Sequence, residues 1–220
     1  MKLLVIICSH KFDVSWYNNI IILNDYMKNL NDYMQNFNIE VDYSGISSQD
    51  DFHNYESIIS FKYKTINTKY QFSKICDFIT DKNYELDYDW YMKIRPDLKL
   101  LENINFNLLS VNAINARARV YFGPKKIKYG MSINLRECYY DDNEHNVIVD
   151  DQLFIFHKNV LQKGAFDKIE AGSVTGWWGT NENEWVHSIV FESRNIPINV
   201  IGINLEFIRD NSFSADLNIY

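Results

Sequence analysis

Apolar residues in the first hundred positions follow two alternating patterns. Short runs rich in Val, Ile and aromatic residues indicate strands, the first being long enough and apolar enough to be buried on both faces. These runs cover residues 2–9, 39–43, 57–64 and 89–95. Between them, apolar residues recur at three- and four-residue steps, which is typical of one face of an amphipathic helix. This spacing predicts helices over residues 16–37 and 68–80.

The order of these elements predicts the fold class. Strands that alternate with helices form mostly parallel sheets covered by helices on both faces. We therefore expect an α/β fold with a mostly parallel central sheet flanked by helices. The polar segment Gly-Ile-Ser-Ser-Gln-Asp-Asp at 45–51 is predicted to be a turn after the second strand.

The second half of the chain is less regular. Its patterns predict strands at 116–122, 147–156 and 196–203, a polar loop or hairpin at 135–146, and a helix at 181–195. Thr180 or Asn181 is a suitable N-cap for that helix. No repeat or linker interrupts the chain, so we expect one domain over 1–220, with halves at about 1–100 and 101–220.

Composition and charge exclude several classes of protein and partner. The chain has 22 basic and 29 acidic residues and a net charge of −7, which argues against a nucleic-acid partner. Its 46% hydrophobic content excludes disorder over the whole length. The three cysteines lack metal-site spacing and suit a reducing compartment. No run approaches the ~20 apolar residues of a membrane helix, so no membrane span is expected.

The segment Lys-Ile-Arg-Pro-Asp-Leu at 93–98 carries the sharpest candidate chemistry. Ligands of open α/β sheets bind beyond the carboxyl ends of the strands. Asp97 is therefore expected where a carboxylate can hold Mn²⁺ or Mg²⁺ against a diphosphate. Arg95 either contacts phosphate directly or orients the Asp97 carboxylate. The alternative is a purely structural Arg–Asp pair at a strand end.

A second candidate lies at Asp150 and Asp151, two adjacent carboxylates between apolar runs. Burying them without partners is costly, so they are either exposed at a turn or used by a site. Side chains of neighbouring strand residues point to opposite faces. At most one of the two is therefore expected to act as a general base.

These motifs resemble those of small GT-A-type glycosyltransferases, which include bacterial surface-polysaccharide enzymes and glycosyltransferase domains of large DNA viruses. The likeness rests on the apolar first strand, the 93–98 motif and Asp-Asp-Gln-Leu-Phe-Ile at 150–155. It implies a single-domain GT-A-like (Rossmann-like) fold. It also implies a metal-dependent enzyme that moves a sugar from a nucleotide sugar, a UDP-sugar, to a glycan or protein-linked glycan. The expected location is the cytoplasm, that of the host if the protein is viral.

Two roles follow from the resemblance for the acidic residues. Asp97 matches the last position of the family's Asp-X-Asp motif, which holds the metal, and Arg95 stands where its first Asp is expected. Asp151, with Asp150 as its rival, matches the base that deprotonates the acceptor in an inverting transfer.

The resemblance also implies binding roles for residues elsewhere in the first half. Ser9 and His10 match the loop at the nucleotide edge, and Lys69 and Lys74 match positions that face the ribose and phosphates. Together with Arg95 and Asp97, they form the expected nucleotide-sugar site.

Other polar and aromatic residues have both a structural and a functional interpretation. Trp177 and Trp178 are candidate acceptor platforms because aromatic faces stack on sugars, with core packing as the alternative. His187 is a structural helix histidine or a late metal ligand. Arg117 and Arg119 are either surface arginines or contacts to phosphate or acceptor. The acidic stretch 141–145 is expected to be a solvated loop.

Two other functions compete with glycosyl transfer. A sugar-phosphate nucleotidyltransferase would share the sheet, but such enzymes carry a Gly-rich loop after the first strand, and residues 9–13 contain no Gly. A non-catalytic carbohydrate- or partner-binding domain fits the replacement of the first Asp by Arg95.

Overall fold

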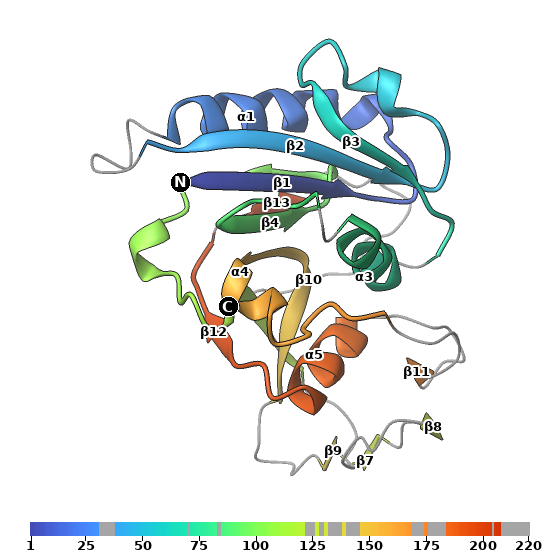
Figure 1. Ribbon diagram of the computed structural model, residues 1–220, viewed down its shortest axis with the longest axis vertical. Helices are drawn as coiled ribbons and strands as arrows, with labels where there is room; N and C mark the ends of the chain where they lie inside the picture. Colours follow the sequence, from blue (N-terminus) through green and yellow to red (C-terminus); the bar gives the residue numbers. More distant parts are fainter. Residues whose placement is uncertain are drawn as a thin grey trace.

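A seven-stranded sheet forms the centre of the molecule (Figure 1). The computed structural model describes residues 1–30, 38–69, 71–82, 85–121, 126–127, 130–131, 138–139, 146–168, 174–175, 184–203 and 205–207. In spatial order the strands are β12 (Ile198–Val200), β6 (Ile114–Tyr121), β10 (Asn146–His157), β4 (Trp90–Ile94), β1 (Lys2–Cys8), β2 (Glu40–Ser47) and β3 (Phe61–Ile66).

The sheet is mostly parallel, as predicted. β1 pairs in parallel with both β2 and β4, and β2 pairs in parallel with β3. β10 is antiparallel to β4 and β6, while β12 is parallel to β6. β10 is therefore the one strand of this sheet that runs against the others. The predicted α/β class is confirmed at this level.

Helices cover both faces of the sheet (Figure 1). The α1 helix (Tyr17–Lys28) lies on one face, and α3 (Gln71–Lys82) and α5 (Glu184–Ser193) lie on the other. The remaining described elements are η1 (Val14–Trp16), η2 (Phe52–Asn54), η3 (Phe106–Leu108), α4 (Lys158–Leu161), β5 (Leu98–Leu100), β7 (Lys126–Ile127), β8 (Gly130–Met131), β9 (Cys138–Tyr139), β11 (Val174–Thr175) and β13 (Leu205–Phe207).

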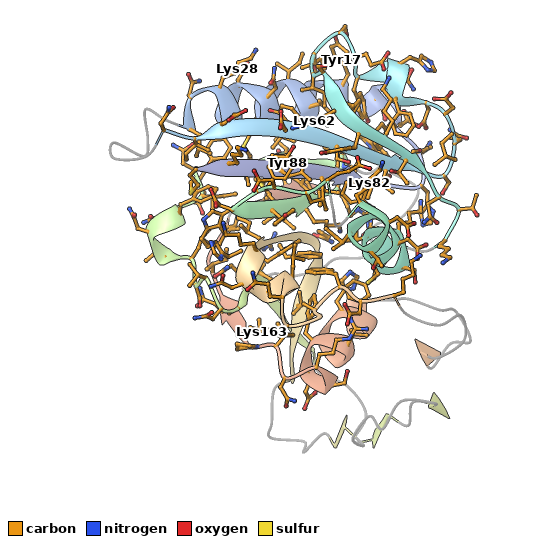
Figure 2. All side chains as sticks on the ribbon, viewed as in Figure 1. Tyr17, Lys28, Lys62, Lys82, Tyr88 and Lys163 are labelled. Carbon is orange, nitrogen blue, oxygen red and sulfur yellow. The ribbon has the colours of Figure 1, made fainter. Side chains whose placement is uncertain are left out.

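The alternation of side chains along β1 builds two cores. Leu3, Val5 and Ile7 pack on the α1 side, whereas Leu4, Ile6 and Cys8 pack on the α3 side. All six are fully buried, which explains why this strand is continuously apolar. Side chains fill both layers between the sheet and its helices (Figure 2).

Two sequence-based boundaries are wrong at the second and third strands. β2 continues to Ser47 through residues predicted to form a turn, because Gly45 and Ile46 pair with Ile7 and Cys8 of β1. β3 begins at Phe61 instead of residue 57, since Ile58 and Ile59 close a turn on the Tyr55 carbonyl. Long-range pairing overrides the local turn chemistry in the first case.

Gly45 is required by the close approach of two aromatic rings. A Cβ at this position would lie 2.8 Å from Cδ1 of Phe52 and 3.1 Å from Cε2 of Phe12. These rings pack edge to face with centroids 5.4 Å apart and are 2% and 0% exposed, so neither has room to move.

We expect Gly45→Ala to lower the free energy of unfolding by about 1–3 kcal/mol, the usual cost of overpacking. Urea denaturation measures this change. Gly202→Ala is the matched control, because its Cβ would meet no atom within 4 Å. Equal stability of the two variants would contradict the packing argument.

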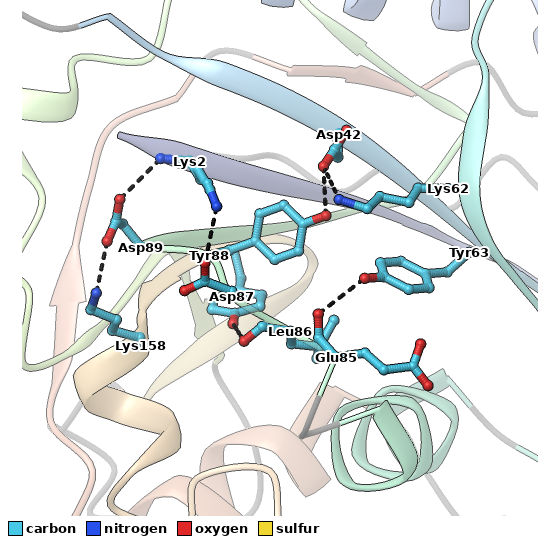
Figure 3. Close-up of polar contacts among 11 residues, drawn as sticks. Lys2, Asp42, Lys62, Tyr63, Glu85, Leu86, Asp87, Tyr88, Asp89 and Lys158 are labelled. Carbon is cyan, nitrogen blue, oxygen red and sulfur yellow. Dashed lines mark hydrogen bonds and ion pairs between the residues drawn. The ribbon is translucent and has the colours of Figure 1, made fainter.

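A network of ion pairs and hydrogen bonds connects neighbouring segments at the amino-terminal edge of the sheet (Figure 3). Lys2 at the start of β1 pairs with Asp87 at 2.9 Å, and its backbone N–H donates to Asp89 Oδ2 at 3.0 Å. Lys158 at the start of α4 pairs with the other oxygen of Asp89 at 2.8 Å. Hydrogen bonds from Lys158 and from the Lys2 backbone lower the pKa of Asp89. This edge therefore joins β1, α4 and the segment before β4.

Candidate functional site

The opposite, carboxyl-terminal edge of the sheet brings together the loops that follow β1 and β2. Cys8 pairs with Ile46 at the ends of these strands. The Ser9 N–H donates to the Ile46 carbonyl at 3.0 Å, and the Ser48 N–H donates to the His10 carbonyl at 3.1 Å. Two of the predicted site residues, Ser9 and His10, therefore lie at the edge where α/β proteins bind ligands.

The pairing of β4 with β10 brings the two acidic motifs to this same edge. Leu153 pairs with Ile94, and the Arg95 N–H donates to the Gln152 carbonyl at 3.1 Å. Because β10 is antiparallel to β4, residues preceding Leu153 extend beyond the carboxyl end of β4. The backbone at Asp150 and Asp151 consequently lies next to the Arg95–Asp97 segment.

A bulge interrupts β10 at these aspartates. Between the pairs Val149–Ala118 and Phe154–Ala116, β10 advances by five residues while β6 advances by two. Arg117 of β6 faces this irregular stretch and is 6% exposed. Bulges often redirect side chains beside functional sites. The side chains of Asp150 and Asp151 lie outside the described part of the chain.

Arg95 and Asp97 form a two-point ion pair. Arg95 Nε donates to Asp97 Oδ1 at 2.9 Å, and Nη2 donates to Oδ2 at 2.5 Å. The Asp97 side chain is 5% exposed, against 25% for Arg95. Asn19 of α1 also donates to the Pro96 carbonyl at 3.1 Å and so anchors this turn. The observed pair agrees both with orientation of Asp97 by Arg95 and with a structural Arg–Asp pair at the strand end.

The ion pair with Arg95 involves the same Asp97 oxygens that were predicted to bind a metal ion. Both carboxylate oxygens already accept hydrogen bonds from Arg95, and Asp97 as a whole is 3% exposed. Among the described residues, no three His, Cys, Asp or Glu side chains gather in a group able to hold a metal ion. The described residues around Asp97 thus form a two-point ion pair, and the Mn²⁺ or Mg²⁺ site stays a prediction.

Lys74 links the loops that follow β1 and β2 at this edge. Its ammonium group, on α3, donates to the Ser9 carbonyl and to Ser48 Oγ, both at 2.7 Å. Lys74 is 0% exposed. Lys69, predicted to act beside it, instead lies on the surface in an ion pair with Asp77 at 2.8 Å. Of the two lysines, Lys74 therefore contacts the Ser9 loop directly.

His10 lies in the positive field of this cluster. Its Nδ1 atom is 3.3 Å from Ser48 Oγ, and the residue is exposed at the edge. Burial of part of the ring, followed by the charges of Lys74 and Arg95, lowers the pKa of His10 below its usual value. The cluster of Lys74 and Arg95 therefore places positive charge beside His10 at this edge.

Three residues of this edge were missed by the sequence analysis. Ser48 was assigned to a turn, although it contacts both Lys74 and His10. Gln71 donates to the Cys8 carbonyl at 3.3 Å and accepts a hydrogen bond from Lys93 Nζ at 2.8 Å. Lys93 is 0% exposed, with its Nζ 5.5 Å from the centroid of the Phe154 ring. A charged residue inside an otherwise apolar strand was the signal available for Lys93.

The other predicted residues divide between the core and the undescribed segments. His187 is 2% exposed, and its ring centroid lies 4.4 Å from that of Phe72, which supports its structural interpretation. Trp177, Trp178 and the acidic stretch 141–145 lie outside the described residues, as does the side chain of Arg119.

No protein-family model matches this chain, and no curated protein matches it significantly. Among the helices of the described segments, none has the length and apolar character needed to cross a membrane.

Proposed function

We propose that this protein is a glycosyltransferase that moves a sugar from a nucleotide sugar, specifically a UDP-sugar, to a glycan or protein-linked glycan. One observation carries the proposal. The register of β4 with β10 brings the Asp150–Asp151 backbone beside Arg95 at the edge that also holds His10 and Lys74. A carboxylate base and a cationic cluster at one edge are the groups that this transfer requires.

The chemistry assigns a different task to each group. An acceptor hydroxyl attacks the anomeric carbon, its proton passes to the carboxylate of Asp151 or Asp150, and the bond to the nucleoside diphosphate breaks. Negative charge then develops on the leaving diphosphate. The charges of Arg95 and Lys74 stabilise it. In our proposal the acceptor attacks from the face opposite the leaving diphosphate, so the transfer inverts the anomeric configuration and needs one base on the acceptor side.

Positive charge at this edge comes from side chains in our proposal. Arg95 occupies the Asp97 carboxylate, so no step is assigned to a metal. The Mn²⁺ or Mg²⁺ ion predicted from sequence stays a separate prediction. Comparing binding and turnover with and without Mn²⁺ tests it directly.

Calorimetry with UDP on the full chain tests the proposal, paired with an assay for UDP released from UDP-sugars. We expect UDP to bind and to raise the melting temperature by mass action. Lys2→Ala is a surface control that should bind equally well, since Lys2 pairs with Asp87 at the opposite, amino-terminal edge of the sheet. Absence of nucleotide binding with and without Mn²⁺ would overturn the proposal. Release of pyrophosphate from a nucleoside triphosphate would overturn it in favour of a nucleotidyltransferase, and saccharide binding without nucleotide binding in favour of a carbohydrate-binding domain.

A further inference from the structure

We propose that Ser48 is a positioning residue that holds His10 as the neutral tautomer protonated on Nε2. The imidazole then presents an N–H donor toward a phosphate oxygen of a bound nucleoside diphosphate. The ligand part of this inference rests on the proposed function. The tautomer part concerns the free protein and stands independently of it.

The hydrogen bond between Lys74 and Ser48 has one possible direction. An ammonium group has three donors and no acceptor, so Ser48 Oγ must accept from Lys74 Nζ across their 2.7 Å separation. A hydroxyl that accepts a charge-assisted bond becomes a better donor through polarisation. Its own hydrogen is therefore available for His10 Nδ1, 3.3 Å away.

His10 carries one ring proton rather than two. The charged groups that face it are Lys74 from α3 and Arg95 from the segment after β4, and both disfavour a second positive charge. Partial burial of the ring acts in the same direction and is the larger effect. A neutral ring that accepts at Nδ1 carries its single proton on Nε2.

Backbone as well as side-chain hydrogen bonds hold His10 beside Ser48. The Ser48 N–H donates to the His10 carbonyl at 3.1 Å, and Lys74 also donates to the Ser9 carbonyl at 2.7 Å. The two loops are therefore joined by a backbone hydrogen bond and by the Lys74 ammonium group, which contacts both Ser9 and Ser48. His10 as a residue is exposed at the carboxyl edge, where ligands of α/β sheets bind.

Long-range ¹H–¹⁵N spectra of the ¹⁵N-histidine-labelled full chain test the tautomer. His157 is an internal reference, because its Nδ1 accepts the Asn159 backbone N–H at 3.2 Å and so must be unprotonated when the ring is neutral. We expect His10 to show the same pattern, with Nδ1 unprotonated and Nε2 protonated. Ser48→Ala should shift His10 Nδ1 toward the protonated position, and Ser48→Thr should restore the original pattern.

Ser57→Ala is the matched control, because it removes a hydroxyl that contacts Tyr17 instead. It should leave the His10 signals unchanged. A protonated Nδ1 in the unmodified protein, or identical His10 spectra in Ser48→Ala, would overturn the tautomer assignment. Saturating UDP should shift the His10 Nε2 signal in the unmodified protein. UDP binding without that shift would overturn the ligand contact alone, whereas absence of UDP binding would overturn the proposed function.

Discussion

Asp151→Asn is expected to lower sugar transfer by roughly 10²–10⁴-fold, the range contributed by a general base. The substitution removes the group that takes the acceptor proton but leaves the cationic cluster at Arg95 and Lys74 in place. UDP affinity should therefore stay within the error of the measurement. Transfer assays with saturating donor, together with UDP calorimetry, separate these two effects.

Asp150→Asn is the matched control, since it makes the same chemical change one residue earlier in the β10 bulge. One general base is enough to accept the acceptor proton, so one of the two variants should retain most of the activity. Retained activity in Asp150→Asn assigns the base to Asp151, and the reverse result assigns it to Asp150. Full activity in both variants would exclude a base at this bulge.

Asp97→Ala should both destabilise the protein and weaken UDP binding. The variant leaves the Arg95 guanidinium without the carboxylate that accepts two of its hydrogen bonds. Removing one partner of a fully buried pair costs roughly 3–5 kcal/mol. We expect about 2 kcal/mol here, since a quarter of the Arg95 side chain is exposed. Urea denaturation measures the loss of stability.

UDP affinity of Asp97→Ala should fall by about tenfold, equivalent to ~1.4 kcal/mol, because the guanidinium is no longer held at the site. We expect the same fall with and without Mn²⁺. A fall in UDP affinity that occurs only in Mn²⁺-containing buffer would support metal binding at Asp97. It would contradict the proposal that side chains alone neutralise the diphosphate. Glu206→Gln is a surface control, expected to change stability by less than ~0.5 kcal/mol. Unchanged stability in Asp97→Ala would contradict the structural importance of the ion pair.

The local pattern of polar and apolar residues predicted the elements whose buried residues are continuous or regularly spaced. The apolar run at the N-terminus became β1, buried on both faces. Of the helix predicted over 16–37, α1 covers Tyr17–Lys28, and residues 31–37 lie outside the described part of the chain. The turn predicted at 45–51 was partly wrong because Gly45 and Ile46 complete a central strand. The local sequence does not indicate that β1 lies beside this segment. It also does not indicate that the rings of Phe12 and Phe52 pack directly against Gly45.

The candidate site shows the same division. From the sequence came the residue types and their place at strand ends, namely Ser9, His10, Arg95, Asp97 and the Asp150–Asp151 pair. The tertiary structure decided which of them meet. The antiparallel pairing of β10 with β4 brings the two acidic motifs to one edge, Arg95 turns to Asp97, and Lys74 reaches Ser48 while Lys69 stays on the surface. Strand register and side-chain partners depend on contacts between segments distant in the chain, which a local pattern of polar and apolar residues does not encode.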